Sequence, residues 1–339
     1  MRKHIAAFLS TAMLLLTGCG SMQKDAHTVD VFAMDTYMTL TAYGNDSVNA
    51  YLIAAEEKLT ALDKKLSVTD AESEVYAANH ANGQAVQISE DTAAILHMAE
   101  TVAAESGGAL QISVYPLVQA WGFTMNQYRV PDAEEIAALL ENVDDTRISF
   151  DDHSLRIPAA MQIDLGALAK GYAGDAVTKL LRNEGVTSAI VNLGGNVQAI
   201  GSKPDGSKWT VGIEDPFGGE DLLGTVRVAD CAVITSGSYE RCFVDENGEK
   251  RWHIMDPADG FPADNGLVSV TVIGRSGLRC DALSTALFVE GTEAAVTHWR
   301  SCDDFEMILV TSDENILVTE GIAADFSVGN GQKPEVLKR

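Results

Sequence analysis

Two residues in the last fifth of the chain have the types and spacing expected for binding a hard metal ion. Asp281 and Thr285 are four residues apart in a run that predicts a helix over about 281–290, so their side chains face the same side at its start. A carboxylate and a hydroxyl at this spacing can share one cation and leave it open positions for waters and substrate phosphates, as Mg²⁺ prefers. The structural alternative is that Asp281 only caps the helix and Thr285 packs behind it.

A second candidate segment, residues 163–171, joins a predicted strand to a predicted helix over about 165–183. Asp164 would end the strand and cap the helix, and that structural role alone could account for it. Lys170 is harder to explain structurally, because the helix dipole disfavours a cation near the start of a helix. A lysine beside a helix N-terminus suits an anionic ligand bound there.

A third candidate is His253, in an alternating, strand-like segment that ends in an Asp256-Pro257 turn. A histidine in this position can exchange a proton near neutral pH, although a lone histidine is more often structural. The paired glycines Gly194-Gly195 follow a predicted strand over 187–193. They would let the backbone approach a ligand closely, or simply form a tight turn.

The elements that must position these residues fall into a helical half and a β-rich half. Apolar spacing predicts helices over about 47–66, 89–105, 132–140 and 165–183. After Gly185, short β-branched runs separated by turn residues predict mostly antiparallel strands, interrupted by helices over about 281–290 and 292–300. This order indicates an α+β fold. The predicted strands cover 187–193, 208–214, 224–228, 231–235, 239–245, 250–255, 267–273, 306–311 and 316–319.

The composition excludes several function classes. The 339 residues carry 24 basic against 49 acidic side chains, a formal net charge of −25, which argues against nucleic acid as a partner. The chain lacks the G-x-x-x-x-G-K-[ST], G-x-G-x-x-G, G-x-S-x-G and H-E-x-x-H motifs. A P-loop kinase, a Rossmann dehydrogenase and a serine hydrolase are therefore poor candidates.

The N-terminus has the pattern of an exported lipoprotein. Arg2 and Lys3 precede an apolar run over 5–16 that is too short to span a bilayer, as in a signal peptide. The following Leu16-Thr17-Gly18-Cys19 resembles a lipobox, which predicts cleavage after residue 18, a lipid on Cys19 and a tether over 19–28; a plain secretory signal is the alternative. Cleavage removes two basic and no acidic residues, so the net charge changes from −25 to −27. We expect a protein anchored to a bacterial cell membrane on its extracytoplasmic face.

Taken together, the motifs resemble the ApbE family of FAD:protein FMN transferases from about residue 29 to residue 320. The resemblance implies an ApbE-like, T-fold-like α+β architecture and leaves 321–339 as a C-terminal tail. The motifs are Met34-Asp35-Thr36, Ser106-Gly107-Gly108-Ala109, Pro116-Leu117-Val118, Trp121-Gly122-Phe123, 163–171, 192–196, Thr235-Ser236-Gly237, 253–257 and 281–287.

The resemblance also implies a reaction and a set of site residues. Members of this family use Mg²⁺ to transfer the FMN moiety of FAD onto a Ser or Thr hydroxyl of a flavoprotein with a D-x-x-[ST]-A-T-type motif, releasing AMP. By resemblance, Asp281 and Thr285 bind Mg²⁺ with the backbone oxygens of Ala167 and Ser284, and His253 takes the proton of the acceptor. The matching flavin contacts are Met34, Thr69, Ala109, Leu110, Gln111, Asp164, Lys170 and Ile254.

The chain departs from the family pattern at two flavin-contacting places. Leu110 and Gln111 stand where the family commonly has an aromatic residue and an aspartate, and Thr69 stands where it usually has an aromatic residue. We expect these changes to alter flavin binding but leave the metal site intact. Two alternatives remain open: an FAD pyrophosphatase that yields FMN and AMP, and a lipoprotein that binds flavin without turnover.

Overall fold

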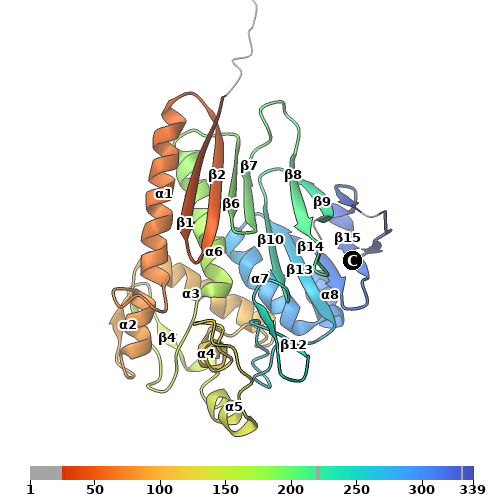
Figure 1. Cartoon of the computed structure of the whole chain (residues 1–339). Helices are drawn as coiled ribbons and strands as arrows, with labels where there is room; N and C mark the ends of the chain where they lie inside the picture. Colours follow the sequence, from red (N-terminus) through yellow and green to blue (C-terminus); the bar gives the residue numbers. More distant parts are fainter. Residues whose placement is uncertain (1–24, 219–221, 330) are drawn as a thin grey trace, which may run out of the picture.

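The computed structural model describes residues 25–218, 222–329 and 331–339 (Figure 1). The predicted signal peptide and Cys19 lie outside these residues. Within the described ranges, no helix has both the length and the apolar character needed to cross a membrane.

A nine-stranded sheet is the centre of the fold, in the order β1-β2-β6-β7-β10-β13-β14-β15-β17 (Figure 1). All neighbouring strands pair antiparallel except β15 and β17, which pair parallel. The predicted α+β fold with mostly antiparallel strands is therefore confirmed. The strands are β1 Asp25–Ala33, β2 Thr36–Gly44, β6 Ala189–Leu193, β7 Asn196–Ile200, β10 Ala232–Gly237, β13 Leu267–Gly274, β14 Phe305–Thr311, β15 Ile316–Thr319 and β17 Glu335–Leu337.

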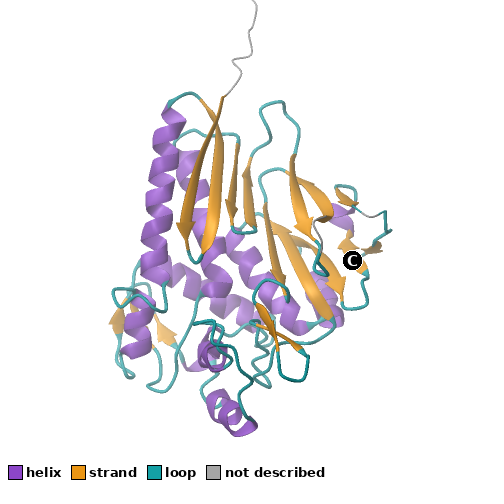
Figure 2. Cartoon of the chain, in the orientation of Figure 1, coloured by secondary structure: helices purple, strands orange, loops and turns teal. Residues whose placement is uncertain are grey.

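Helices cover one face of this sheet (Figure 2). The main apolar core lies between the sheet and the long helices. Helix α1 buries one stripe of apolar side chains, whereas α7 is buried on almost all sides. The opposite face packs on a three-stranded sheet of β8 Trp209–Glu214, β9 Leu222–Val228 and β16 Phe326–Val328. The helices are α1 Ser47–Leu66, α2 Glu74–His80, α3 Glu90–Glu105, α6 Gly166–Asn183, α7 Gly277–Glu290, α8 Thr292–Ser301 and α9 Glu320–Ala323.

A smaller lobe lies below the sheet in Figure 1 and has its own apolar cluster around Trp121. The Trp121 indole N–H donates to the Gly260 carbonyl at 3.0 Å, which ties the lobe to the segment after His253. The lobe contains α4 Tyr115–Ala120, α5 Ala133–Leu140, β11 Cys242–Val244 and β12 Lys250–Trp252. Nearby short elements are β3 Val86–Gln87, β4 Ser149–Phe150, β5 Ser154–Arg156 and the 3₁₀ turns η1 Ile112–Val114 and η2 Asp145–Arg147.

The ends of the expected domain are more ordered than the sequence suggests. Strand β1 begins at Asp25, inside the expected tether over 19–28. The segment 321–339, expected to be a tail, supplies β16 to the small sheet and β17 to the edge of the large one. Both ends of the described chain therefore contribute to sheets.

Candidate active site

Asp281 is a buried carboxylate in the second turn of α7, not a helix cap as the structural alternative supposed. The cap of α7 is Ser276, whose hydroxyl accepts the N–H of Arg279 at 3.3 Å. Asp281 is 5% exposed, and its two oxygens accept the Gly171 N–H at 2.7 Å and the Asn196 side-chain amide at 3.0 Å. Burial raises the pKa of Asp281 to about 6, although Lys170 and these two donors stabilise the charged form.

Two glycines allow α6 and α7 to approach closely enough for this arrangement. A Cβ atom on Gly171 would lie 2.3 Å from the Gly277 carbonyl oxygen and 2.6 Å from the Cβ of Asp281. Because neither neighbour is a flexible side-chain end, only glycine fits at 171 without moving a helix. The glycine that ends the 163–171 motif thus brings its own N–H to Asp281.

Hydroxyl groups from α7 and from β10 lie close together near Asp281. The Ser236 hydroxyl from β10 lies 2.8 Å from that of Ser284 and 3.3 Å from that of Thr285, and Ser284 donates to the Asp281 carbonyl at 2.8 Å. Ala167 is four residues before Gly171 on α6, so in a regular helix its carbonyl accepts the Gly171 N–H. This is the same N–H that donates to the Asp281 carboxylate. The set contains hard oxygen donors only, which fits Mg²⁺ and not a thiophilic metal.

Charged side chains surround this oxygen cluster. Lys170 is close enough to Asp281, Glu240 and His253 to influence the pKa of each. Arg241 acts in the same way on Asp164 and His253, and lies 3.9 Å from the Asp35 carboxylate in the β1–β2 turn. Lys170 belongs to α6, and Arg241 belongs to the segment after β10. Through Arg241 this charged region reaches the β1–β2 turn, which contains Met34.

His253 lies just after β12 and is strongly desolvated. Its backbone N–H donates to the Arg241 carbonyl at 3.1 Å, and its buried Nδ1 has no hydrogen-bond partner among the described residues. Burial, followed by the charges of Arg241 and Lys170, lowers the pKa of His253 to about 4. A histidine usually has a pKa near neutrality, but the pKa of His253 in the free protein is lower, so its imidazole is neutral at pH 7.

Asp164 begins α6 in a different way from the one predicted. It lies in an extended segment outside any strand, and the helix cap position belongs to Leu165. Its Oδ1 accepts the Gly166 N–H at 2.9 Å, and burial raises the pKa of its carboxyl group. Its location beside Arg241 keeps it in the same charged region as Lys170 and His253.

The remaining flavin-contact candidates are placed less uniformly. Met34 forms the β1–β2 turn with a φ of 50°, and Ile254, next to His253, is 6% exposed. The Leu110 side chain is 2% exposed in the main core, so only its backbone can face a ligand, whereas Ala109 is partly buried against that core. Thr69 is an exposed residue of the loop after α1, where its hydroxyl lies 3.2 Å from that of Ser67.

A match to a known family covers the residues of this site. A family model described as the ApbE family matches residues 34–309, which include every one of these candidates. The chain belongs to the ApbE family. An FAD:protein FMN transferase from Klebsiella pneumoniae is 36% identical over 268 residues, covering 77% of this chain and 82% of its own length. Another from Treponema pallidum is 33% identical over 290 residues, covering 79% and 80%.

Solved ApbE structures share the fold of this ApbE-family chain. The ApbE protein from Thermotoga maritima superposes with a TM-score of 0.81 at 31% identity, covering 88% of this chain and 98% of its own. The flavin transferase ApbE from Vibrio cholerae has a TM-score of 0.78 at 25% identity, covering 86% and 96%.

Sequence reasoning gave no role to Asn196, Glu240 or Arg241 of this ApbE-family protein. Asn196 ends the 192–196 motif, and Glu240 and Arg241 lie in the predicted strand over 239–245. Their part in the site depends on contacts that spacing does not reveal. Asn196 reaches Asp281 because it starts β7, which follows the Gly194-Gly195 turn. The available signal was the Glu240-Arg241 pair, three residues after a largely buried strand.

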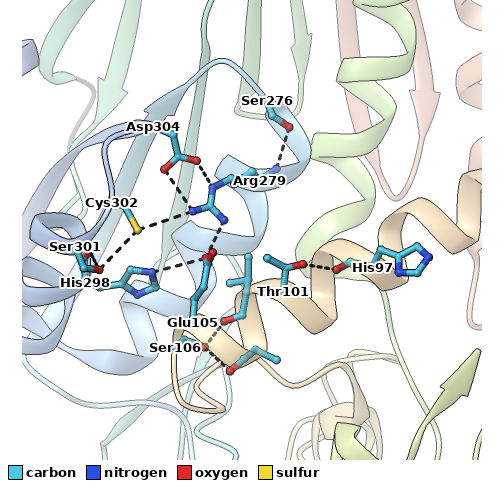
Figure 3. Close-up of polar contacts among 12 residues, drawn as sticks. His97, Thr101, Glu105, Ser106, Ser276, Arg279, His298, Ser301, Cys302 and Asp304 are labelled. Carbon is cyan, nitrogen blue, oxygen red and sulfur yellow. Dashed lines mark hydrogen bonds and ion pairs between the residues drawn. The ribbon is translucent and has the colours of Figure 1, made fainter.

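A network outside the charged cluster anchors α7 (Figure 3). Arg279, two residues before Asp281, donates to Glu105 at 2.8 Å and also to Asp304. Glu105 is the last residue of α3 and directly precedes the loop 106–111. His298 lies beside the same carboxylate at 4.0 Å. The helix that positions Asp281 is thereby tied to the start of the expected flavin loop.

Proposed function

We propose that this protein transfers the FMN moiety of FAD onto a Ser or Thr hydroxyl of an acceptor flavoprotein and releases AMP. The observation that carries the proposal is a buried, hard-oxygen cluster around Asp281 that adjoins two cations and a neutral histidine. No lysine or arginine in the described part of the chain forms an ion pair with Asp281. A buried carboxylate without such a partner is a suitable ligand for a divalent cation.

The residues present fit Mg²⁺. Asp281 and Thr285 would hold it through side-chain oxygens, and Ala167 and Ser284 would do so through backbone oxygens. Bound there, Mg²⁺ would neutralise charge on the pyrophosphate oxygens of FAD. Lys170 and Arg241 provide further positive charge on the same side, which an enzyme of net charge −25 needs in order to attract an anionic substrate.

The chemical step is a phosphoryl-group substitution. The hydroxyl oxygen of the acceptor forms a bond to the phosphorus of the FMN half, and the bond from that phosphorus to the bridging oxygen breaks. AMP leaves with the bridging oxygen, and the hydroxyl proton passes to His253. A neutral imidazole can accept this proton at pH 7, and a pyrophosphate near Lys170 and Arg241 would offset the charges that depress the pKa of His253.

The location and partner of the protein form part of the same proposal. Cys19 would carry the lipid anchor and place the domain on the extracytoplasmic face of a bacterial membrane. The acceptor would then be an exported or membrane-bound flavoprotein with a D-x-x-[ST]-A-T-type motif. Radiolabelled palmitate incorporation into the wild type, and not into a Cys19→Ala variant, would test the anchor.

One assay separates transfer from the two alternatives. The form spanning residues 20–339 is incubated with FAD, Mg²⁺ and an acceptor, and then acceptor fluorescence in a denaturing gel and released AMP are measured. Fluorescent acceptor supports transfer, AMP without label indicates hydrolysis, and bound FAD without either product indicates a binding protein.

Two variants test the assigned roles within this assay. Asp281→Asn removes the charge while keeping the shape, and should reduce labelling at least 100-fold, with partial recovery at high Mg²⁺. His253→Gln should reduce labelling about 100-fold without changing FAD affinity, since general base catalysis contributes about 10²–10⁴-fold. Unchanged labelling by Asp281→Asn would refute the metal assignment.

A further inference from the structure

Asp145 belongs to η2, and its carboxylate contacts the turn that directly follows the expected flavin loop. Its Oδ2 accepts the Ile112 N–H at 2.7 Å, and its Oδ1 accepts the Ser113 N–H at 3.0 Å and the Ser113 hydroxyl at 2.5 Å. These N–H groups belong to η1, the 3₁₀ turn that directly follows Gln111. One side chain therefore satisfies the first two amides of that turn.

Gln111 does not cap this turn, although it occupies the cap position. Its side chain makes no hydrogen bond to η1; instead its carbonyl oxygen accepts the Asp145 N–H at 2.8 Å. An aspartate at a cap position is short enough to accept the amides of its own turn, whereas a glutamine is not among the favoured caps. The carboxylate that position 111 lacks is supplied by Asp145, and Gln111 holds Asp145 in return.

Ile112, which donates to Asp145, also contacts Asp164. The Ile112 carbonyl accepts the Asp164 N–H at 2.9 Å. The preceding residue, Ile163, is held on both sides by Asn79, through its N–H at 2.8 Å and its carbonyl at 2.9 Å. Asp145 thus supports, through one backbone carbonyl, the extended segment that leads into α6.

From these contacts we infer that Asp145 is a positioning residue for FAD binding. It holds the loop 109–111 and the Asp164 segment in the conformation that receives the flavin nucleotide, without touching the reacting atoms. The inference rests on the proposed function, because it concerns how that same site is kept in shape. It predicts that loss of the Asp145 carboxylate weakens FAD binding and leaves the chemical step nearly unchanged.

The first test compares Asp145→Ala and Asp145→Asn with a matched control, Asp144→Ala. The control removes the same charge one residue away. Among the described residues the Asp144 carboxylate caps η2 by accepting the N–H and the hydroxyl of Thr146, and it makes no hydrogen bond to η1. We expect Asp145→Ala to raise the FAD Kd and KM about tenfold, equivalent to about 1.4 kcal/mol, with kcat within twofold of the wild type. Asp145→Asn keeps one acceptor oxygen and should raise Kd about threefold. The control removes a cap of η2 but no contact with η1, and should leave Kd within twofold of the wild type.

The second test is a rescue. Gln111→Asp combined with Asp145→Ala places a carboxylate at the cap position itself, where it can accept the Ser113 amide, since a cap side chain accepts from the second or third residue of its turn. We expect this double variant to recover FAD Kd to within threefold of the wild type. Gln111→Asp alone places two carboxylates together and should weaken binding. A general loss of stability would not be reversed by this exchange.

Hydrogen exchange provides a readout that needs no FAD. The Ile112 and Ser113 amides should lose protection in Asp145→Ala and keep it in Asp144→Ala. In the double variant the Ser113 amide should regain protection. Unchanged protection, or an FAD Kd within twofold of the wild type in Asp145→Ala, would overturn the inference. If Asp145→Ala does not fold, Asp145→Asn and the double variant decide by the same criteria. A wild type that binds FAD but labels no acceptor would refute the proposed transfer and leave this test intact.

Discussion

Replacing Gly171 with alanine would test whether the contact between α6 and α7 positions Asp281. The added Cβ would lie 2.3 Å from the Gly277 carbonyl oxygen, where an ordinary contact begins at 3.4 Å. The two helices must therefore separate locally by about 1 Å, because the opposing atom belongs to the backbone and has no alternative rotamer. This movement would lengthen the 2.7 Å hydrogen bond from Gly171 to Asp281.

The expected loss is larger in activity than in stability. Overpacking costs about 1–3 kcal/mol, and alanine recovers about 1 kcal/mol of helix propensity relative to glycine. The free energy of unfolding should thus fall by about 1 kcal/mol. Displacing Asp281 by about 1 Å should reduce kcat/KM for FAD about 100-fold, since misplacement on that scale has such effects on reacting groups.

The assay pairs urea unfolding, followed by circular dichroism, with AMP release in the presence of FAD, Mg²⁺ and acceptor. Gly212→Ala in β8 is the control, because the three atoms nearest to its Cβ, the first at 2.8 Å, would all belong to the movable Leu222 side chain. Gly212→Ala should retain activity within twofold. If Gly171→Ala kept activity within threefold, the close approach of α6 and α7 would not be what positions Asp281, and the reasoning would fail.

Three further predictions concern titration and reactivity. Burial disfavours the Asp91 carboxylate, but hydrogen bonds from Lys65, Tyr172 and Lys58 outweigh it and lower the pKa of Asp91 to about 2. Because the folded pKa is depressed, Asp91 should stabilise the wild type relative to Asp91→Asn by about 1 kcal/mol above pH 4, after allowance for solvent screening, and lose that advantage as pH falls towards 2. Urea unfolding at pH 7 and pH 3 measures this, and an equal advantage at both would contradict it. The pKa of His253 predicts an NMR titration midpoint near 4 in the free protein; a midpoint near 6.5 would mean that the imidazole is solvated. Burial raises the pKa of Cys280 well above its usual value, so iodoacetamide should label it only after unfolding; rapid labelling of the native protein would show that the α7–β13 packing opens.

The sequence predicted best those elements whose pattern and ends are both local. Helix α1 was predicted with its observed bounds because its buried residues recur at helical spacing. The cap of α5 was also visible, since the Asp132 carboxylate accepts the Glu135 N–H. Strand β7 was not predicted, because all five of its residues are buried and it lacks the alternation that marks a half-buried strand.

The sequence predicted the residues of the site more fully than their arrangement in space. The motifs contained Asp281, Thr285, Lys170 and His253, but their sequence could not show that α7 starts one turn early at a Ser276 cap. Nor could it reveal Asp145, whose partners lie 32 and 33 residues away along the chain. Such contacts depend on how loops meet in the folded protein, and local spacing contains no information about them.

The hydrogen bonds of Asp281 also have a kinetic consequence. Its two donors, Gly171 and Asn196, are 110 and 85 residues before it in the chain. Contacts of such high sequence separation form late, because the chain must lose the entropy of closing a long loop before the contact can stabilise the fold. A chain emerging during synthesis has no Asp281 site until the part up to α7 is complete. Fragments ending before α7 should therefore be inert, so flavin chemistry would begin only once the domain has folded.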